Sequence, residues 1–207
     1  MVYVARQCRR PSSGVGRLLA RRMNAAHDNL TRWGLSHVDV QAGFTILDVG
    51  CGGGRTIETL ASMATAGQVF GIDYSPASVA VARERNHASI EAGRVHIREG
   101  SVSSLPFPEH TFDLVTAVET HYYWPDLGAD VREVMRVLKP GGTFTIIAET
   151  YRGRRNDWLY RPVMRLVLRA TYLTVEQHRR LLADAGYHDV EVFEERARGW
   201  ICATGHT

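Results

Sequence analysis

The most informative part of the chain is Leu47-Asp-Val-Gly-Cys-Gly-Gly-Gly-Arg-Thr56, in which a short apolar run stops at a cluster of glycines. The run over 45–49 is typical of a buried strand, and the residues after the glycines have the spacing of a helix over 54–66. The glycines permit a sharp turn and let backbone N–H groups approach a ligand closely. In an α/β protein, such a ligand binds at the carboxyl end of the first strand.

The strand and helix patterns alternate along the rest of the chain. We expect strands at 45–49, 68–73, 94–99, 112–118 and 143–148, and helices at 54–66, 75–91, 125–138 and 174–185. Two closing strands, near 188–195 and 199–205, are joined by a tight turn and therefore pair antiparallel. The alternation predicts an α/β protein with a doubly wound, seven-stranded, mostly parallel, Rossmann-like sheet whose last strand is antiparallel.

Residues with special backbone roles mark the ends of these elements. Ser75 and Pro76 supply the N-cap and first-turn proline of one helix, and Thr174 caps another, with Gly186 just past its end. The run Lys139-Pro-Gly-Gly142 is expected to form a turn that ends the helix over 125–138.

The glycine loop departs from the patterns that bind phosphates. A dinucleotide fingerprint has a small residue where this chain has Arg55, and a P-loop has lysine before Thr56. The second strand ends in Asp73, which is 23 residues after Gly50 and is placed to hydrogen-bond a ribose diol. The loop therefore fits a nucleoside better than a dinucleotide.

Four motifs in this chain resemble those of class I S-adenosylmethionine-dependent methyltransferases. The sequence over 47–54 looks like their first motif, and the similarity continues through Gly71-Ile-Asp-Tyr-Ser75 and Leu105-Pro-Phe-Pro-Glu-His-Thr-Phe-Asp-Leu114. It ends with Glu133-Val-Met-Arg-Val-Leu-Lys-Pro-Gly-Gly-Thr-Phe144, typical of the subgroup that includes ubiquinone/menaquinone-type small-molecule methyltransferases. The motifs occur in family order with family spacing across roughly residues 44–150.

The resemblance implies a cofactor site for S-adenosylmethionine, with S-adenosylhomocysteine as the product. In that site Asp48 would order the loop near the sulfonium, while Asp73 would accept hydrogen bonds from the ribose hydroxyls. The adenine would lie against Tyr74 and would be contacted by the Ser101 hydroxyl or the Val102 backbone, because this chain lacks the Gly-Asp found there in many relatives. Gly50 and Gly52 would line the methionine and ribose portion, with Cys51 between them also at the cofactor. The backbone of Glu119, at the end of the fourth strand, would meet the amino end of the cofactor.

The resemblance does not name the acceptor. The segment after the fourth strand contains His121, whose ordinary pKa near 6.5 suits a general base. The alternative for His121 is a loop histidine bonded to backbone. Tyr122, Tyr123 and Trp124 either line an acceptor pocket or pack in the core.

Composition excludes several classes of protein. The 207 residues are 44% hydrophobic and 23% charged, as in globular proteins, and are predicted to form one domain over 1–207. No apolar run suits a membrane span, and no apolar segment follows the N-terminal basic residues as in a secretory signal. Cys8, Cys51 and Cys202 are spaced unlike a disulfide framework or a zinc site, which predicts a cytoplasmic protein without a metal.

Arginines are concentrated in two segments. Residues 1–32 carry seven Arg and one acid, and residues 151–173 carry six Arg and one acid, although the whole chain has a net charge of +3. We expect an N-terminal helical cover over 1–40, with a helix at 12–34, and an inserted lid helix within 151–173. Their arginines suit an anionic acceptor and their apolar faces a lipophilic one, whereas nucleic acid is disfavoured for want of an aromatic-rich basic stripe.

These observations predict methyl transfer from S-adenosylmethionine to a small-molecule or lipophilic acceptor by in-line displacement. Two alternatives stay open. One is a non-catalytic S-adenosylmethionine-binding module, and the other, which Arg55 disfavours, is an NAD(P)-dependent oxidoreductase.

Overall fold

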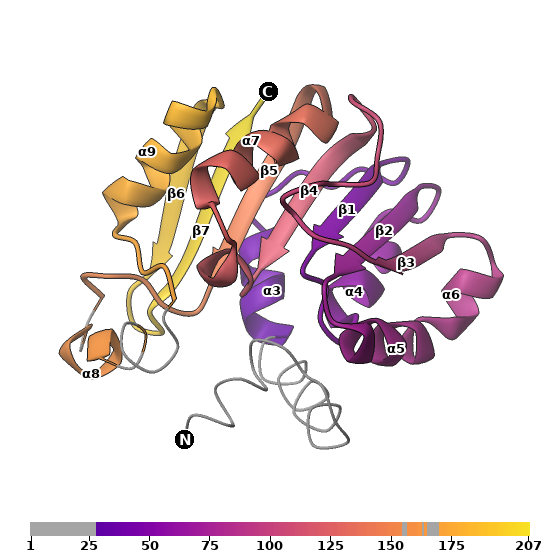
Figure 1. Cartoon of the computed structure of the whole chain (residues 1–207), viewed down its shortest axis with the longest axis horizontal. Coiled ribbons are helices and arrows are strands. Elements are labelled where there is room, and N and C mark those ends of the chain that lie inside the picture. The colour runs from indigo at the N-terminus through magenta and orange to yellow at the C-terminus, as the bar shows by residue number, and fades with distance from the viewer. Residues whose placement is uncertain (1–27, 155–156, 163, 165–169) are drawn as a thin grey trace.

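A computed structural model describes residues 28–154, 157–162, 164 and 170–207 of the chain. Its centre is a seven-stranded sheet in the order β3-β2-β1-β4-β5-β7-β6, in which β7 alone runs antiparallel to its neighbours. This confirms the predicted doubly wound, mostly parallel sheet (Figure 1). The strands are β1 Thr45–Val49, β2 Gln68–Asp73, β3 Val95–Glu99, β4 Phe112–Val118, β5 Leu138–Ala148, β6 His188–Glu195 and β7 Trp200–His206.

Helices cover both faces of the sheet. Those described are α3 Asp28–Leu35, α4 Arg55–Met63, α5 Pro76–Arg85, α6 His87–Glu91, α7 Leu127–Val137, α8 Asp157–Pro162, α9 Val175–Ala185 and the 3-10 helix η1 His121–Tyr123. Helices α7 and α9 pack on one face, and α3, α4 and α5 pack on the other (Figure 1). Each face has its own apolar core, and residues from β1 enter both, because successive side chains of a strand point to opposite faces. None of the helices in the described ranges has the length and apolar character needed to cross a bilayer.

Most predicted helix ends are confirmed. Ser75 caps α5, with its side chain accepting from the backbone N–H of Ser78, and Pro76 opens the helix. Thr174 and Gln177 form a reciprocal capping box at the start of α9, and Gly186 ends that helix with a φ of 106°.

Two predicted elements differ from the structure. The helix expected over 75–91 is split into α5 and α6 at Asn86, whose side-chain amide donates to the carbonyls of Ala82 and Gly54 at 2.9 and 3.0 Å. The turn expected at 139–142 lies inside β5, where the register against β4 shifts between Phe112 and Leu114. The strand tolerates this irregularity because Gly141 adopts a φ of 76°.

The two covering segments are described only in part. Of the helix predicted over 12–34, residues 12–27 lie outside the described residues, and the remainder belongs to α3, which packs against α4, β5 and β7. Close packing depends on Gly34, because a Cβ atom there would lie 2.5 Å from the side chain of Ile147. Of the lid helix predicted within 151–173, the structure describes the short α8, while 170–173 is not helical and 155–156, 163 and 165–169 lie outside the described residues.

Candidate active site

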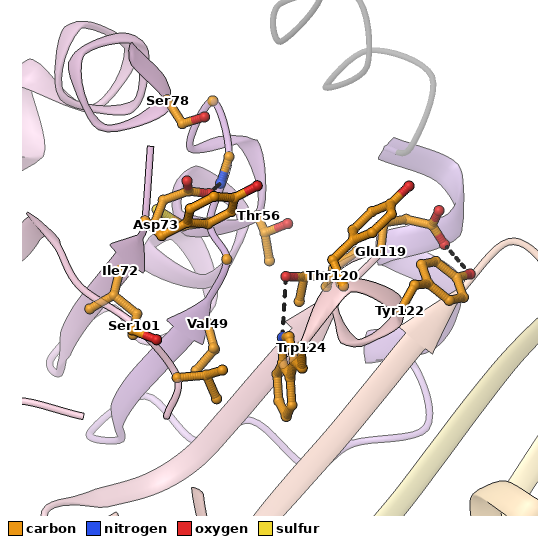
Figure 2. A pocket seen from close by; sticks show the side chains of 18 of the residues that line it. Val49, Thr56, Ile72, Asp73, Ser78, Ser101, Glu119, Thr120, Tyr122 and Trp124 are labelled. Carbon is orange, nitrogen blue, oxygen red and sulfur yellow. Dashed lines mark hydrogen bonds between the residues drawn. The ribbon is translucent and has the colours of Figure 1, made fainter. Parts of the chain in front are cut away.

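A cavity of about 510 Å³ opens at one edge of the sheet. The carboxyl ends of β1, β2, β3, β4 and β5 all contribute to its wall, and α3 contributes Thr31. The sheet order places β1 between β2 and β4, so the chain changes direction across the sheet at this edge. Ligands of open α/β sheets bind at such a switch point. Figure 2 shows Asp73 and Ser101 on one side of the cavity and Glu119 and Tyr122 on the other.

The glycine loop after β1 is held in place by β2. The backbone N–H groups of Gly50 and Cys51 both donate to the carbonyl of Ile72, at 2.8 and 2.9 Å. Gly50 has a φ of 74°, and a Cβ atom there would lie 2.1 Å from the Thr120 hydroxyl oxygen. Gly52 has a φ of 51°, and a Cβ atom there would meet nothing within 4 Å. The loop therefore needs glycine at position 50 to close against β4, and at position 52 it leaves open space at the cavity wall.

Asp73 is fixed at the end of β2 by backbone donors. Its Oδ2 accepts from the N–H of Gly52 and its Oδ1 from the N–H of Ser75, both at 2.9 Å. Burial raises the pKa of this carboxyl, and the hydrogen bonds from Ser75, Gly52 and Ser78 oppose that rise. Each carboxylate oxygen keeps a further lone pair, so the group can accept a hydroxyl from the cavity.

The structure brings the other residues assigned to the nucleoside to the same end of the cavity. Tyr74 lines the wall with 39% of its surface exposed, beside Asp73. Ser101 and Val102 line it from the end of β3, where the Ser101 hydroxyl accepts from the N–H of Ser103 at 3.3 Å. Cys51 also lines the cavity, and burial raises the pKa of its thiol well above the ordinary value.

Asp48 lies beneath the loop rather than on the cavity wall. It is buried within the sheet, where its Oδ1 accepts from the hydroxyl of Thr116 on β4 at 2.7 Å. Burial raises the pKa of this carboxyl to about 7. The side chain links β1 to β4 under the glycine loop, and the structure does not place it among the residues that line the cavity.

His121 also lies away from the cavity that a general base would have to reach. The 3-10 helix η1 turns its ring into the protein, where it is fully buried and its Nε2 lies 3.4 Å from Nε2 of His178 on α9. His178 in turn places Nδ1 2.8 Å from the carbonyl of Thr174. Burial lowers the pKa of both rings, to about 4 for His178 and well below the ordinary value for His121. The structure corrects the sequence-based placement of His121 and leaves the cavity without it.

The residues that follow His121 do line the cavity. Tyr122, Tyr123 and Trp124 form its aromatic wall, although Tyr122 and Trp124 are also largely buried in the core. Trp124 donates its indole N–H to the Thr120 hydroxyl at 3.4 Å. Tyr122 and Trp124 thus both line the cavity and pack in the core, and their role toward an acceptor stays a prediction.

Glu119 directly follows β4 and has a φ of 58°, which is unusual for a residue other than glycine. Its Oε1 accepts from the Tyr122 hydroxyl at 3.2 Å and from the backbone N–H of Glu149. Burial, and then the nearby charge of Glu149, raise the pKa of the Glu119 carboxyl to about 8. The resemblance implies a cofactor contact for the backbone of Glu119 alone, and the structure places the residue on the cavity wall together with Glu149.

Several further residues of the wall were not singled out as site residues from the sequence, among them Glu149, Thr150, Thr31 and Met164. Glu149 and Thr150 follow the fifth parallel strand directly, so their position at the ligand-binding edge was a usable signal. Thr31 and Met164 come from the two covering segments, and no local pattern marks them. Over the described parts of the chain, no cluster of three or more His, Cys, Asp and Glu side chains has the arrangement of a metal site.

The sheet order, the glycine loop and the acid at the end of β2 define a Rossmann-like protein with a nucleoside-sized site at its switch point. Residues 47–146 match the family described as a methyltransferase domain. Residues 47–146 thus form a methyltransferase domain, in agreement with the resemblance of the motifs to class I S-adenosylmethionine-dependent methyltransferases.

Individual relatives agree with this assignment. Methyltransferase GfsG of Streptomyces halstedii is 34% identical over 132 residues, which are 64% of this chain and 47% of the relative. The 27-O-demethylrifamycin SV methyltransferase of Amycolatopsis mediterranei is 36% identical over 109 residues, 52% of this chain and 39% of the relative. The chain thus spans less than half the length of either. The crystal structure of a SAM dependent methyltransferase from Aquifex aeolicus has the same fold, with a TM-score of 0.73 at 21% identity over 92% of this chain and 96% of that one.

Proposed function

We propose that this protein transfers the methyl group of S-adenosylmethionine to a small-molecule acceptor by in-line displacement. One observation carries the proposal: a single cavity joins the glycine loop and Asp73 at one end to Tyr122, Tyr123 and Glu149 at the other. In-line displacement requires that two reactants be aligned and that water be kept away from them. A cavity with a nucleoside end and an aromatic end meets both requirements.

The residues at the nucleoside end fit this cofactor. The open space beside Gly52 leaves room for a ligand against the loop, and the Asp73 carboxylate is held by two backbone donors with lone pairs to spare for a ribose diol. Tyr74 supplies a partly exposed ring for the adenine. When bound, S-adenosylmethionine supplies an electrophilic methyl group. The chain's own residues orient the nucleoside and exclude water.

The described wall at the other end favours a lipophilic acceptor over an anionic one. It contains Tyr122, Trp124 and Met164, and its carboxyl groups would repel an anion. The one cation on this described wall is Arg55, which is already ion-paired with Asp28 at 3.1 Å. The arginines of the covering segments therefore do not form an anion-binding site in the described part of the cavity.

We further propose that the segments 1–40 and 151–173 act as cover and lid within one domain over 1–207. Each sends one described residue to the cavity wall, Thr31 and Met164 respectively. We expect Met164→Ala to raise the acceptor KM several-fold while leaving the S-adenosylhomocysteine affinity within about twofold. An unchanged KM would reject this role of Met164. A reducing, cytoplasmic location is supported by Cys51 and Cys202, which are both free and buried.

Label transfer tests the proposed activity. The purified chain is incubated with S-adenosylmethionine carrying a tritiated methyl group and with separate panels of phenols, amines and carboxylic acids. We expect label in at least one organic product. Binding of S-adenosylhomocysteine without transfer to any panel would favour a non-catalytic binding module, and binding of NADH instead would favour an oxidoreductase.

A further inference from the structure

We propose that the side-chain carboxylate of Glu119 accepts the proton released by the acceptor, and that the acceptor group is a phenolic or enolic hydroxyl. This inference rests on the proposed methyl transfer and adds the proton acceptor that His121 does not provide. Glu119 is thereby given a catalytic role through its side chain, beside the backbone contact that the family resemblance implies.

The backbone holds Glu119 at the acceptor end of the cavity, beside Tyr122 and Glu149. Glu119 directly follows β4, and the next residue, Thr120, contacts the glycine loop, because its side chain occupies the space that a side chain at Gly50 would need. Figure 2 shows the Glu119 side chain next to Tyr122, across the cavity from Asp73. A reacting group bound between the loop and the aromatic wall would therefore pass close to this carboxylate.

The two oxygens of the Glu119 carboxylate have different surroundings. Oε1 accepts from the Tyr122 hydroxyl and from the N–H of Glu149, so its orientation is fixed. The Tyr122 hydroxyl has one proton, which it shares between Oε1 and the carbonyl of Thr150, 3.3 Å away. Oε2 accepts no hydrogen bond from any residue in the described ranges and belongs to a side chain of the cavity wall. This arrangement leaves one anchored oxygen and one that can take a proton.

The surroundings also make this carboxylate a stronger base than an ordinary glutamate. The described titratable and charged groups that face it are Glu149 from the end of β5 and Tyr122 from η1, while Arg154 donates to the carbonyl of Glu149. Burial and the Glu149 charge favour the protonated form, which raises the pKa to about 8. A base with a pKa near the working pH is effective in proton transfer, and it is matched to a weakly acidic hydroxyl.

The proposed step balances without any further reactant. The acceptor oxygen forms a bond to the methyl carbon as the carbon–sulfur bond breaks, and the electron pair of that bond stays on sulfur. The hydroxyl proton moves to Oε2 of Glu119. The products are a methyl ether, the neutral thioether of S-adenosylhomocysteine and a protonated carboxyl, which later releases its proton to water.

The experiment compares phenol, which is protonated at pH 7.5, with 4-nitrophenol, which is largely ionised there. For Glu119→Gln we expect kcat with phenol to fall about 100-fold or more, because general-base catalysis is lost. With 4-nitrophenol the loss should stay under about fivefold, because this acceptor arrives without the proton. The S-adenosylhomocysteine Kd, measured by calorimetry, should change less than threefold. Glu99→Gln, which alters an exposed carboxylate outside the cavity, is the matched control.

A second variant and a spectroscopic measurement test whether the charge of Glu149 raises the pKa of the Glu119 carboxyl. Glu149→Gln removes the neighbouring charge, so the rise of the phenol rate with pH should move to lower pH. In 13C NMR of protein labelled at the glutamate carboxyl carbons, one signal should titrate well above the others in the wild type. That signal should be absent from Glu119→Gln and shifted to lower pH in Glu149→Gln.

Several results would overturn the proposal for Glu119, and they can be distinguished from results that would reject the proposed methyl transfer. Equal losses with both phenols, or a large loss of S-adenosylhomocysteine affinity in Glu119→Gln, would mean that Glu119 holds the cofactor. A wild type that binds S-adenosylhomocysteine but methylates neither phenol would reject the hydroxyl class. A wild type that does not bind S-adenosylhomocysteine would instead reject the proposed methyl transfer itself.

Discussion

The two ends of the cavity are built in different ways. At the nucleoside end the site is defined mainly by the backbone. Gly50 and Gly52 adopt positive φ values, and the Asp73 carboxylate is oriented by the backbone N–H groups of Gly52 and Ser75. At the acceptor end residues from distant parts of the chain line one wall, as Glu119, Glu149 and Met164 do. The backbone-defined nucleoside end tolerates few residue types. The acceptor end, which is defined by side chains, can be substituted while the fold is kept.

The largest expected effect comes from disturbing the backbone at the nucleoside end. In Gly50→Ala the new methyl group would meet the Thr120 hydroxyl, and a φ of 74° is strained for alanine. We expect the S-adenosylhomocysteine affinity to fall about 100-fold or more, as measured by calorimetry. The control is Gly43→Ala, whose Cβ would meet nothing within 4 Å and which should bind normally. Normal binding by both variants would show that loop closure against β4 is not required.

The second prediction concerns the pH dependence of stability near the acceptor end. The side chains of His121 and His178 form a buried pair there, outside the cavity wall. A histidine whose pKa is lowered by folding stabilises the protein above its ordinary pKa near 6.5, and this stabilisation is lost as the pH falls toward 4. For His178 the loss is on the order of 3 kcal/mol. We therefore expect the difference in unfolding free energy between wild type and His178→Gln to change by about this amount between pH 7 and pH 4.

Denaturant unfolding at a series of pH values measures this difference. The control is His87→Gln, because His87 is exposed on α6 and pairs with the exposed side chain of Glu91. Parallel curves for wild type and His178→Gln would contradict the buried, neutral state of the pair.

A smaller effect is expected from Asp73→Asn. The amide keeps the size of the side chain and one acceptor oxygen, but it loses the charge that strengthens hydrogen bonds to a diol, and the backbone N–H of Gly52 or Ser75 loses its acceptor. We expect a loss of S-adenosylhomocysteine affinity of about 10- to 30-fold together with a lower Tm, measured by calorimetry and thermal unfolding. Glu99→Gln is again a suitable control, since Glu99 lies opposite Asp73 in the register of β2 and β3 but outside the cavity. An Asp73→Asn protein that binds as tightly as the wild type would remove Asp73 from the site.

The difference between the two ends also explains how far the sequence could be interpreted. The sheet and the nucleoside end could be predicted because glycine positions, helix caps and the Gly50-to-Asp73 spacing are local signals of backbone geometry. His121 could not be placed, because whether its ring faces the cavity or α9 depends on the turn of η1 and on His178, which is 57 residues away. The partnership of Glu119 with Glu149 likewise depends on the pairing of β4 with β5.

Thermal unfolding with saturating S-adenosylhomocysteine, and with NADH as the control, tests the central claim most directly. At a ligand concentration near 100 times Kd, binding to the folded state adds about 2.7 kcal/mol, which corresponds to a rise in Tm of roughly 5–10 °C for a domain of this size. The nucleoside end described here predicts that rise with S-adenosylhomocysteine and none with NADH. No rise with S-adenosylhomocysteine, or a rise with NADH alone, would contradict it.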